Sequence, residues 1–304
     1  MSKKIIIVAD EPGWIFDRHA HEIQKRLPEY DIQIAYRRQN IYELSKQFDL
    51  VYVMDPIPLK QYPPQEKTIL GLRCQFLYED HPDGPRGLYY NGFPGRCVSI
   101  QDKCCIFHVV NMNQLRTFQP IVNDKPLILA QHGVDTNIFY YDRRKANLDD
   151  DVEVSLSGRP TPNKAFDKVI EVCKKMNIKV NMATYRSRLS KEQMPDFYMK
   201  SNVCVCFSKT EGLNNVLMES GAVGLAPIAT KTGAAPEMIE HNWSGLLIDR
   251  NEGDLEGALD KMRNTSNRNE MANNFMMGIH AYWSWDARIK DFRKMFNLYF
   301  EEIL

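Results

Sequence analysis

Residues 208–237 read SKTEGLNNVLMESGAVGLAPIATKTGAAPE, and this stretch decides the fold. An apolar run of strand length precedes it at 203–207, and residues 213–222 have the pattern of a helix. A strand, a polar loop and a helix N-terminus together form an anion site, because free backbone N–H groups point at the ligand. Glu211 and Glu219 stand on that loop and in that helix, where their carboxylates can accept hydrogen bonds from hydroxyl groups. A phosphorylated sugar is the ligand class that needs both features.

The rest of the chain repeats an alternation of strand and helix patterns. Because strands that alternate with helices form parallel sheets, the pattern predicts an α/β protein with two doubly wound sheets. The first series has strands at 5–9, 31–36, 50–54, 68–79, 103–110 and 127–130, with helices at 16–27, 41–47 and 111–119. The second has strands at 152–156, 178–182, 203–207 and 226–230, with helices at 164–176 and 193–200, from 213, from 236, and at 254–262 and 267–282.

Charge and aromatic content place the domain boundaries. Residues 142–151 are strongly charged and lack apolar periodicity, so they are predicted to be a linker. A last helix at 285–303 is rich in aromatic side chains. We therefore predict a first domain at 1–141, a linker at 142–151, a second domain at 152–282 and a C-terminal helix at 283–304.

Composition restricts the classes of function. With 304 residues, of which 43% are hydrophobic, the chain is long enough for two cores. Basic and acidic side chains balance at 39 each, and they also balance within residues 1–135, which argues against a nucleic-acid partner. The seven cysteines lack metal-ligand spacing and are interpreted as buried thiols, which indicates a reducing, cytoplasmic location. We expect neither a secretory signal nor a transmembrane segment.

Two cations follow the first strand of the second series. Arg159 and Lys164 stand five residues apart on the loop before the next helix, where an α/β sheet places ligand-binding groups. Arginine can bind two oxygens at once and lysine acts as a point charge, so the pair suits a phosphate. The alternative is that both are solvated surface cations, because the spacing alone does not distinguish the two interpretations. Gly13, after the first strand of the chain, would let a phosphate approach the backbone closely or would simply cap a turn.

The titratable residues do not indicate a metal or a bound cofactor. No His, Asp or Glu spacing resembles a metal site, and no GxGxxG accompanies Gly13, so we expect no metal and no nicotinamide or flavin. His108 lies inside an apolar run and is interpreted as a core residue. His81 follows a predicted strand in the sequence Tyr78-Glu-Asp-His-Pro.

These features resemble the family-four retaining glycosyltransferases (glycosyl transferases group 1). The block that opens with Glu211 resembles their Glu-Gly, second Glu and Pro-Glu signature. Four other stretches agree in order, namely Asp10–Trp14, Gln131–Asp135 with Phe139, Ser157–Arg159 with Lys164, and Trp283–Asp286. The resemblance implies the GT-B fold, in which two Rossmann-like domains face each other across a cleft and the last helix crosses back to the first domain.

The resemblance also implies roles for individual residues. Glu211 would lie beside the transferred sugar, Glu219 would bind the ribose hydroxyls, and His81 would be the first-domain catalytic histidine. The diphosphate would be bound by Arg159, Lys164 and Gly13, and the donor sugar and nucleotide by Gly212, Leu213, Asn214 and Asn215. The family more often has Phe-Gly at the positions of Leu213 and Asn214, which leaves the identity of the sugar open.

The implied activity is transfer of a sugar from a nucleoside diphosphate sugar to an acceptor hydroxyl, with retention and without a metal. The donor would be a co-substrate, so no cofactor is expected. Three alternatives remain open, namely a sugar-nucleotide epimerase of the same fold, a nucleic-acid-modifying glycosyltransferase, and an inactive nucleotide-sugar-binding module. The acceptor would be a glycan, a lipid-linked molecule or another hydroxyl compound, and peripheral contact with a membrane is left open.

Overall fold

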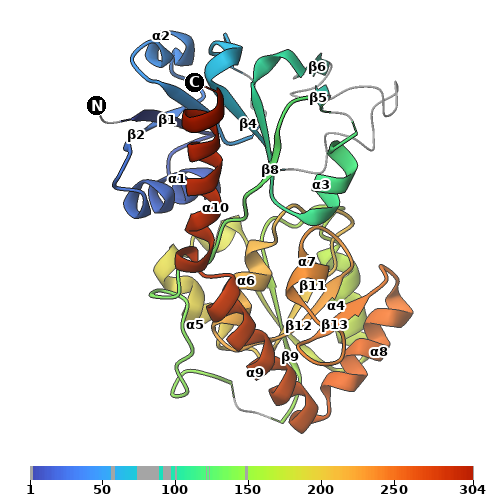
Figure 1. Ribbon diagram of the computed structural model, residues 1–304. Coiled ribbons are helices and arrows are strands. Elements are labelled where there is room, and N and C mark those ends of the chain that lie inside the picture. The colour runs from blue at the N-terminus through green and yellow to red at the C-terminus, as the bar shows by residue number, and fades with distance from the viewer. Residues whose placement is uncertain are drawn as a thin grey trace. The chain divides into compact units, whose positions relative to one another are not determined.

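The computed structural model describes residues 3–55, 59–73, 89–91, 97–99, 101–120, 122, 124–147 and 150–303. The chain divides into two compact units (Figure 1). The first unit comprises Met1–His132 and Arg288–Leu304, and the second unit comprises Gly133–Ala287. Each unit has its own parallel sheet with helices on its faces, which confirms the predicted α/β class.

The boundary between the units lies earlier than the predicted domain end at 141. Val134 pairs with the segment before the last helix, donating its N–H to Trp283 O at 2.8 Å and accepting from Trp285 N–H at 3.0 Å. The described part of 142–151 is also not a free linker. Asn147 N–H donates to Met199 O at 2.8 Å in the second unit. The charges in this stretch therefore belong to the surface of the second unit.

The first sheet has six parallel strands in the order β2-β1-β3-β4-β7-β8. Its central strands are apolar on both faces, as parallel strands covered by helices must be. The strands are β1 (Lys4–Ala9), β2 (Asp31–Tyr36), β3 (Leu50–Val53), β4 (Thr68–Leu72), β7 (Ile106–Val109) and β8 (Leu127–Leu129); β5 (Tyr89–Asn91) and β6 (Cys97–Ser99) pair separately as an antiparallel ribbon. The helices are α1 (Ile15–Arg26), α2 (Ile41–Ser45), α3 (Met112–Phe118) and α10 (Trp285–Leu298). Short 3₁₀ turns lie at Gln65–Lys67 and Gln101–Lys103.

The last helix packs on the first unit, as the resemblance implied. From Arg288 onward α10 belongs to that unit, and it continues as a π-helical turn at Tyr299–Ile303. The ring of Tyr52 lies 6.4 Å from that of Phe292 and 5.9 Å from that of Phe296. The aromatic face that the sequence places on this helix is therefore buried against the first sheet.

The second sheet has five parallel strands in the order β10-β9-β11-β12-β13. Figure 1 shows α4 and α8 on one side of this sheet and α5, α6 and α9 on the other. The strands are β9 (Glu153–Ser157), β10 (Lys179–Ala183), β11 (Val203–Cys206), β12 (Ala226–Thr230) and β13 (Leu246–Ile248). The helices are α4 (Phe166–Lys175), α5 (Met194–Tyr198), α6 (Asn215–Ala222), α7 (Ala235–Met238), α8 (Glu252–Met262) and α9 (Thr265–Tyr282), with 3₁₀ turns at Tyr185–Ser187 and Lys191–Gln193.

The strand order of the second sheet positions the site. The chain runs outward from β9 to β10 and then returns to the other side of β9 as β11. The connections that follow β9 and β11 therefore leave the sheet toward opposite faces. Doubly wound sheets bind ligands at the carboxyl ends of the two strands where the order reverses. Arg159 and Lys164 follow β9, and Glu211 follows β11, so the cations and the acid flank this point.

Candidate functional site: a cation and a carboxylate at the switch point of the second sheet

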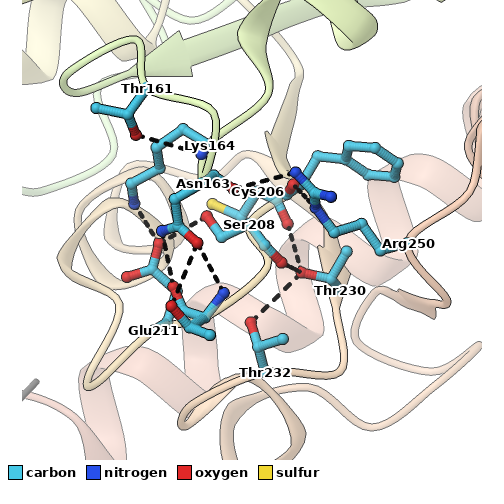
Figure 2. A network of polar contacts seen from close by, with 11 residues as sticks. Thr161, Asn163, Lys164, Cys206, Ser208, Glu211, Thr230, Thr232 and Arg250 are labelled. Atoms are coloured by element: carbon cyan, nitrogen blue, oxygen red, sulfur yellow. Dashed lines mark hydrogen bonds and ion pairs between the residues drawn. The ribbon is translucent and has the colours of Figure 1, made fainter. Parts of the chain in front are cut away.

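Lys164 and Glu211 form an ion pair between the two loops (Figure 2). Their side chains are 23% and 15% exposed, so the pair is largely withdrawn from water. Ser208 Oγ donates a second hydrogen bond to Glu211 Oε1 at 2.7 Å. Burial alone would lower the pKa of Lys164, but the Glu211 carboxylate outweighs it, so that the pKa is raised and the ammonium remains charged.

The backbone just after Lys164 is strained. Ala165, the N-cap of α4, has φ of +46° in the left-handed region, which costs a residue with a Cβ about 1–2 kcal/mol. The lysine is also the last residue of a tight turn that starts at Thr161, because its N–H donates to Thr161 O at 2.9 Å. The turn orients Lys164 away from the axis of α4 and toward the β11–α6 loop. Strain of this kind is typical of positions where a side chain must be held for binding.

Amide and guanidinium groups tie the two loops together. Asn163 Oδ1 accepts from Thr210 N–H at 2.9 Å, and Asn163 Nδ2 donates to Thr210 O at 3.0 Å. Arg250 donates to Phe207 O at 3.1 Å and to Pro162 O at 2.9 Å, so one side chain spans both loops (Figure 2). The distance between Lys164 and Glu211 is therefore set by backbone contacts on either side of the pair.

The loop after β12 supports the β11–α6 loop from behind. Thr230 Oγ1 donates to Ser208 O at 2.7 Å, and Ala234 N–H donates to Gly212 O at 3.0 Å. Gly233 has φ of +55°, and a Cβ built on it would lie 2.6 Å from Glu211 O. Only glycine allows this close approach of two backbones.

Glu219 lies on α6, in the turns nearest the site. Tyr198 Oη donates to Glu219 Oε2 at 2.8 Å. Burial and the Glu219 carboxylate raise the pKa of Tyr198 well above its ordinary value, so the phenol remains a donor at all physiological pH values. Lys164 and Glu219 both act electrostatically on the buried thiol of Cys204, so both charges lie near β11.

The other residues of the signature differ in exposure. Leu213 and Asn214 are 6% and 3% exposed, so their side chains are packed inward. Asn214 is the N-cap of α6, and Asn215 is its first residue. The sequence pattern predicted that this helix begins at 213, two residues too early, because the apolar Leu213 fits the helical pattern while it belongs to the loop.

Arg159 borders a separate hollow of about 570 Å³ at the end of β9. Met182, Thr184, Tyr185 and Arg186 line the same hollow, and the Tyr185 side chain is 63% exposed. Thr184 caps the 3₁₀ turn that carries Tyr185, accepting from Arg186 N–H at 3.2 Å. The structure thus shows an exposed aromatic ring and two guanidinium groups beside the loop that holds Lys164.

Two predicted residues fall on the first unit. Gly13, which lies just before the N-cap of α1, has φ of +78°, a conformation suited to glycine, and its N–H donates to Asp17 Oδ2 at 2.7 Å. Its role toward a ligand stays a prediction. His81 lies outside the described residues.

A buried cluster at the carboxyl edge of the first sheet was not predicted. Arg73, which follows β4, donates through Nη2 to Nδ1 of His19 at 2.9 Å and to Nδ1 of His132 at 2.6 Å. Because arginine only donates, both Nδ1 atoms accept, and both imidazoles are neutral with their proton on Nε2. Arg73 lies 54 positions from His19 and 59 positions from His132 in the sequence, and the three residues share no motif, so the sequence offered no signal for this cluster.

His108 is a satisfied core residue, as interpreted from the sequence. Its Nδ1 accepts from Tyr52 Oη at 2.8 Å, and its Nε2 donates to Ala130 O at 2.6 Å. Burial, aided by Arg73, lowers its pKa to about 3. Cys104, Cys105, Cys173, Cys204 and Cys206 are free thiols, and no described helix is long and apolar enough to cross a bilayer.

The second unit contains a match to a known protein family. Residues 131–265 match the family model described as glycosyl transferases group 1. The chain is 26% identical over 121 residues to the GDP-mannose-dependent α-(1-6)-phosphatidylinositol monomannoside mannosyltransferases of two Mycobacterium tuberculosis strains. That match covers 36% of this chain and spans about a third (31%) of the length of each relative.

Solved structures resemble the whole chain. A sucrose-phosphate synthase from Thermosynechococcus elongatus has a TM-score of 0.76 at 10% identity, over 98% of this chain and 99% of that protein. The Anabaena protein HepE, solved with UDP and glucose, has a TM-score of 0.72 at 10% identity, over 97% and 99%. A glycosyltransferase from Rickettsia africae has a TM-score of 0.71 at 13% identity, over 99% of both chains. At these identities the likeness concerns the fold.

Proposed function

We propose that this chain, which has the GT-B fold and carries a glycosyl transferases group 1 domain over residues 131–265, transfers a sugar from a nucleoside diphosphate sugar to an acceptor hydroxyl. One observation carries the proposal. Lys164 and Glu211, a cation and an acid from different loops, meet at the switch point of the second sheet. A diphosphate needs the cation, and a sugar beside it needs the acid.

The donor is proposed to lie along the carboxyl ends of β9 and β11. Lys164 and Arg159 are proposed to bind the diphosphate, and Gly13 is proposed as a further backbone contact of the phosphates. Glu219, held by Tyr198, accepts hydrogen bonds from the ribose hydroxyls. The exposed ring of Tyr185 offers a flat surface for the nucleobase, since bases stack on aromatic side chains.

The sugar is proposed to lie beside Glu211 and the backbone of Gly212–Asn215. Leu213 and Asn214 are buried, so this contact uses their main-chain groups together with the side chain of Asn215. As the anomeric bond breaks, negative charge grows on the leaving diphosphate. A fixed ammonium held in a site withdrawn from water stabilises that charge, and this is the largest contribution that the described residues make. The charge stabilisation therefore comes from side chains, and the proposed transfer uses no metal.

The proposed transfer retains the anomeric configuration by attack on the face that the diphosphate leaves. The departing phosphate oxygen takes the proton of the acceptor hydroxyl, so the C–O bond to the acceptor forms as the C–O bond to the diphosphate breaks. His81 is proposed as a further sugar contact. The mycobacterial relatives use GDP-mannose and HepE was solved with UDP and glucose, so these two donors are the first to test. A glycan or lipid-linked acceptor is proposed by the same analogy.

The experiment compares two lysines of the same helix region. Lys164→Met removes the proposed diphosphate cation, whereas Lys168→Met removes an exposed lysine whose Nζ lies 3.5 Å from Glu252. GDP-mannose, UDP-glucose and an ADP-sugar are titrated into each protein by calorimetry. We expect one of them to bind the unaltered chain and Lys168→Met alike and to bind Lys164→Met at least tenfold more weakly. Equal affinity for all three proteins would refute the proposed site, and donor consumption without an acceptor would indicate an epimerase instead.

A further inference from the structure

Exposed aromatic and thioether side chains gather in a groove on the second unit, away from the Lys164–Glu211 pair. A hollow of about 610 Å³ lies between α7, α9 and the turn that connects α7 to β13. Trp243, Met277 and Tyr282 line it and are 53%, 60% and 68% exposed. Large apolar side chains exposed together in a hollow are typical of a binding site.

The groove continues past Trp243 into a second hollow with a different lining. This hollow, of about 430 Å³, shares Trp243 with the first and is lined mainly by amide and carboxylate side chains, including Asn264, Asn267 and Glu270. The residues of α9 that line the two hollows recur every three or four positions from Asn267 to Tyr282, so they form one face of that helix. At 1.5 Å per residue this face is about 22 Å long.

The backbone of Trp243, the residue that both hollows share, is held in place by its own turn and by α9. Asn274 Nδ2 on α9 donates to Trp243 O at 3.0 Å. Trp243 N–H donates to Glu240 O at 3.1 Å, and Ser244 Oγ accepts from Glu240 N–H at 2.9 Å. A large side chain on a fixed backbone loses little further freedom on binding, which favours affinity.

The lining excludes two classes of ligand. Glu237 and Glu240 line the first hollow, and Asp260 and Glu270 line the second against a single Lys261. This negative balance repels nucleic acids and sulfated or phosphorylated polymers. A purely apolar acyl chain would leave the amides and carboxylates of the second hollow without hydrogen-bond partners.

We propose that the groove binds an uncharged oligosaccharide. The face of a tryptophan or tyrosine ring packs on the C–H groups of a sugar ring while the edge remains polar. Carboxylate and amide oxygens accept hydrogen bonds from the hydroxyls of the same sugars. Both kinds of group line the groove, and its length suits a chain of several sugar units rather than a monosaccharide.

The groove is linked to the proposed donor site through α7. The loop before this helix contacts Gly212 through Ala234 N–H, and the C-terminal end of the four-residue helix lines the groove. We therefore assign the oligosaccharide as part of a glycan acceptor or product, and this assignment rests on the proposed function. The binding of an oligosaccharide by the groove does not rest on the proposed function, because it can be measured without a sugar donor.

The test measures binding of mannohexaose, maltohexaose and chitohexaose to the full chain by calorimetry, with a heparin hexasaccharide as the anionic control. We expect at least one neutral hexasaccharide to bind, with Trp243→Ala and Tyr282→Ala each weakening it tenfold or more. Tyr140→Ala is the matched control, since Tyr140 is 51% exposed in the same unit and does not line the groove. The affinity of Tyr140→Ala for the hexasaccharide should equal that of the unaltered protein.

Two further measurements keep the outcome interpretable. If Trp243→Ala lowers the melting temperature, Asn267→Ala and Glu270→Ala test the second hollow, because both side chains are exposed. Nucleoside diphosphate affinity should be the same in all groove variants, so failure of the donor site would be seen separately. The inference is overturned if no neutral hexasaccharide binds at millimolar concentration, if the groove variants bind like Tyr140→Ala, or if the heparin hexasaccharide binds in their place.

Discussion

Replacing Glu211 by glutamine should strengthen the binding of a free nucleoside diphosphate while it slows sugar transfer. In the structure, Lys164 is engaged by Glu211, so a phosphate that binds this lysine must displace the carboxylate. Glutamine keeps the size of the side chain and its bond from Ser208 but removes the negative charge. The lysine of Glu211→Gln is then available to the ligand without that competition.

The expected size follows from the exposure of the pair. A hydrogen bond to a charged group contributes about 1.5–3 kcal/mol, and partial solvation at 23% and 15% exposure reduces this to roughly 1–2 kcal/mol. The corresponding gain in affinity is about 5- to 30-fold. Transfer should fall at least about 100-fold, because the proposed sugar contact is lost in the transition state.

A double-mutant cycle provides the assay. The nucleoside diphosphate is titrated by calorimetry into the unaltered chain, Glu211→Gln, Lys164→Met and the double variant. Lys164→Met should bind at least tenfold more weakly, and adding Glu211→Gln to it should change nothing further. If Glu211→Gln weakens binding tenfold or more, the carboxylate supports the ligand directly and the competition derived from the ion pair is refuted.

Three other perturbations test neighbouring parts of the structure. Gly233→Ala would place its Cβ 2.6 Å from a backbone oxygen of the β11–α6 loop, at a position with positive φ. In thermal melts it should therefore lower the unfolding free energy by about 2 kcal/mol or more, and it should abolish transfer. Gly257→Ala, whose Cβ meets nothing within 4 Å, is the control and should be neutral or stabilising in the same melts. Tyr198→Phe removes the hydrogen-bond donor to Glu219 and should weaken nucleotide binding about fivefold in calorimetry. Glu219→Ala should weaken it more, and equal losses of affinity in the two variants would contradict the role of Tyr198 in orienting Glu219. The pKa of His108 is about 3 in the folded state and near 6.5 in the unfolded state. Its contribution to the unfolding free energy is therefore complete above pH 6.5 and is lost as the pH falls toward 3, at about 1.4 kcal/mol per pH unit. Denaturant unfolding between pH 6.5 and 5 should show this slope, and His108→Gln should lack it.

The elements of the second unit were predictable because each has a strong local pattern. The bounds of the strand predicted at 203–207 agree with those of β11 to within one residue, and the predicted helix after it is present as α6. β13 (Leu246–Ile248) was missed because three apolar residues after a turn have no periodicity of their own. It forms because β12 offers an open edge, which is a tertiary effect.

The partners within the site were not predictable. The sequence places Arg159 and Lys164 on one loop and so predicts that they act together. In the structure Lys164 forms an ion pair with Glu211, whereas Arg159 lines the hollow beside Tyr185. Asn163 and Arg250, which fix the spacing of the loops, bond partners 43 to 88 positions away, and no motif encodes such contacts. Local pattern determines which loop carries a residue, and packing determines what it faces.

The ion pair also predicts selectivity for a nucleotide that carries its sugar. When a diphosphate takes Lys164, the released Glu211 keeps only the hydrogen bond from Ser208 and remains largely buried, which is costly for a carboxylate. The hydroxyls of a donor sugar can replace the lost partner, whereas a nucleoside diphosphate alone cannot. A non-hydrolysable analogue of the donor should therefore bind more tightly than its nucleoside diphosphate in the unaltered chain, and this preference should shrink about tenfold in Glu211→Gln, where no charge needs a new partner. Calorimetric titration of both ligands into both proteins gives the two ratios, and identical ratios would show that Glu211 does not contact the sugar.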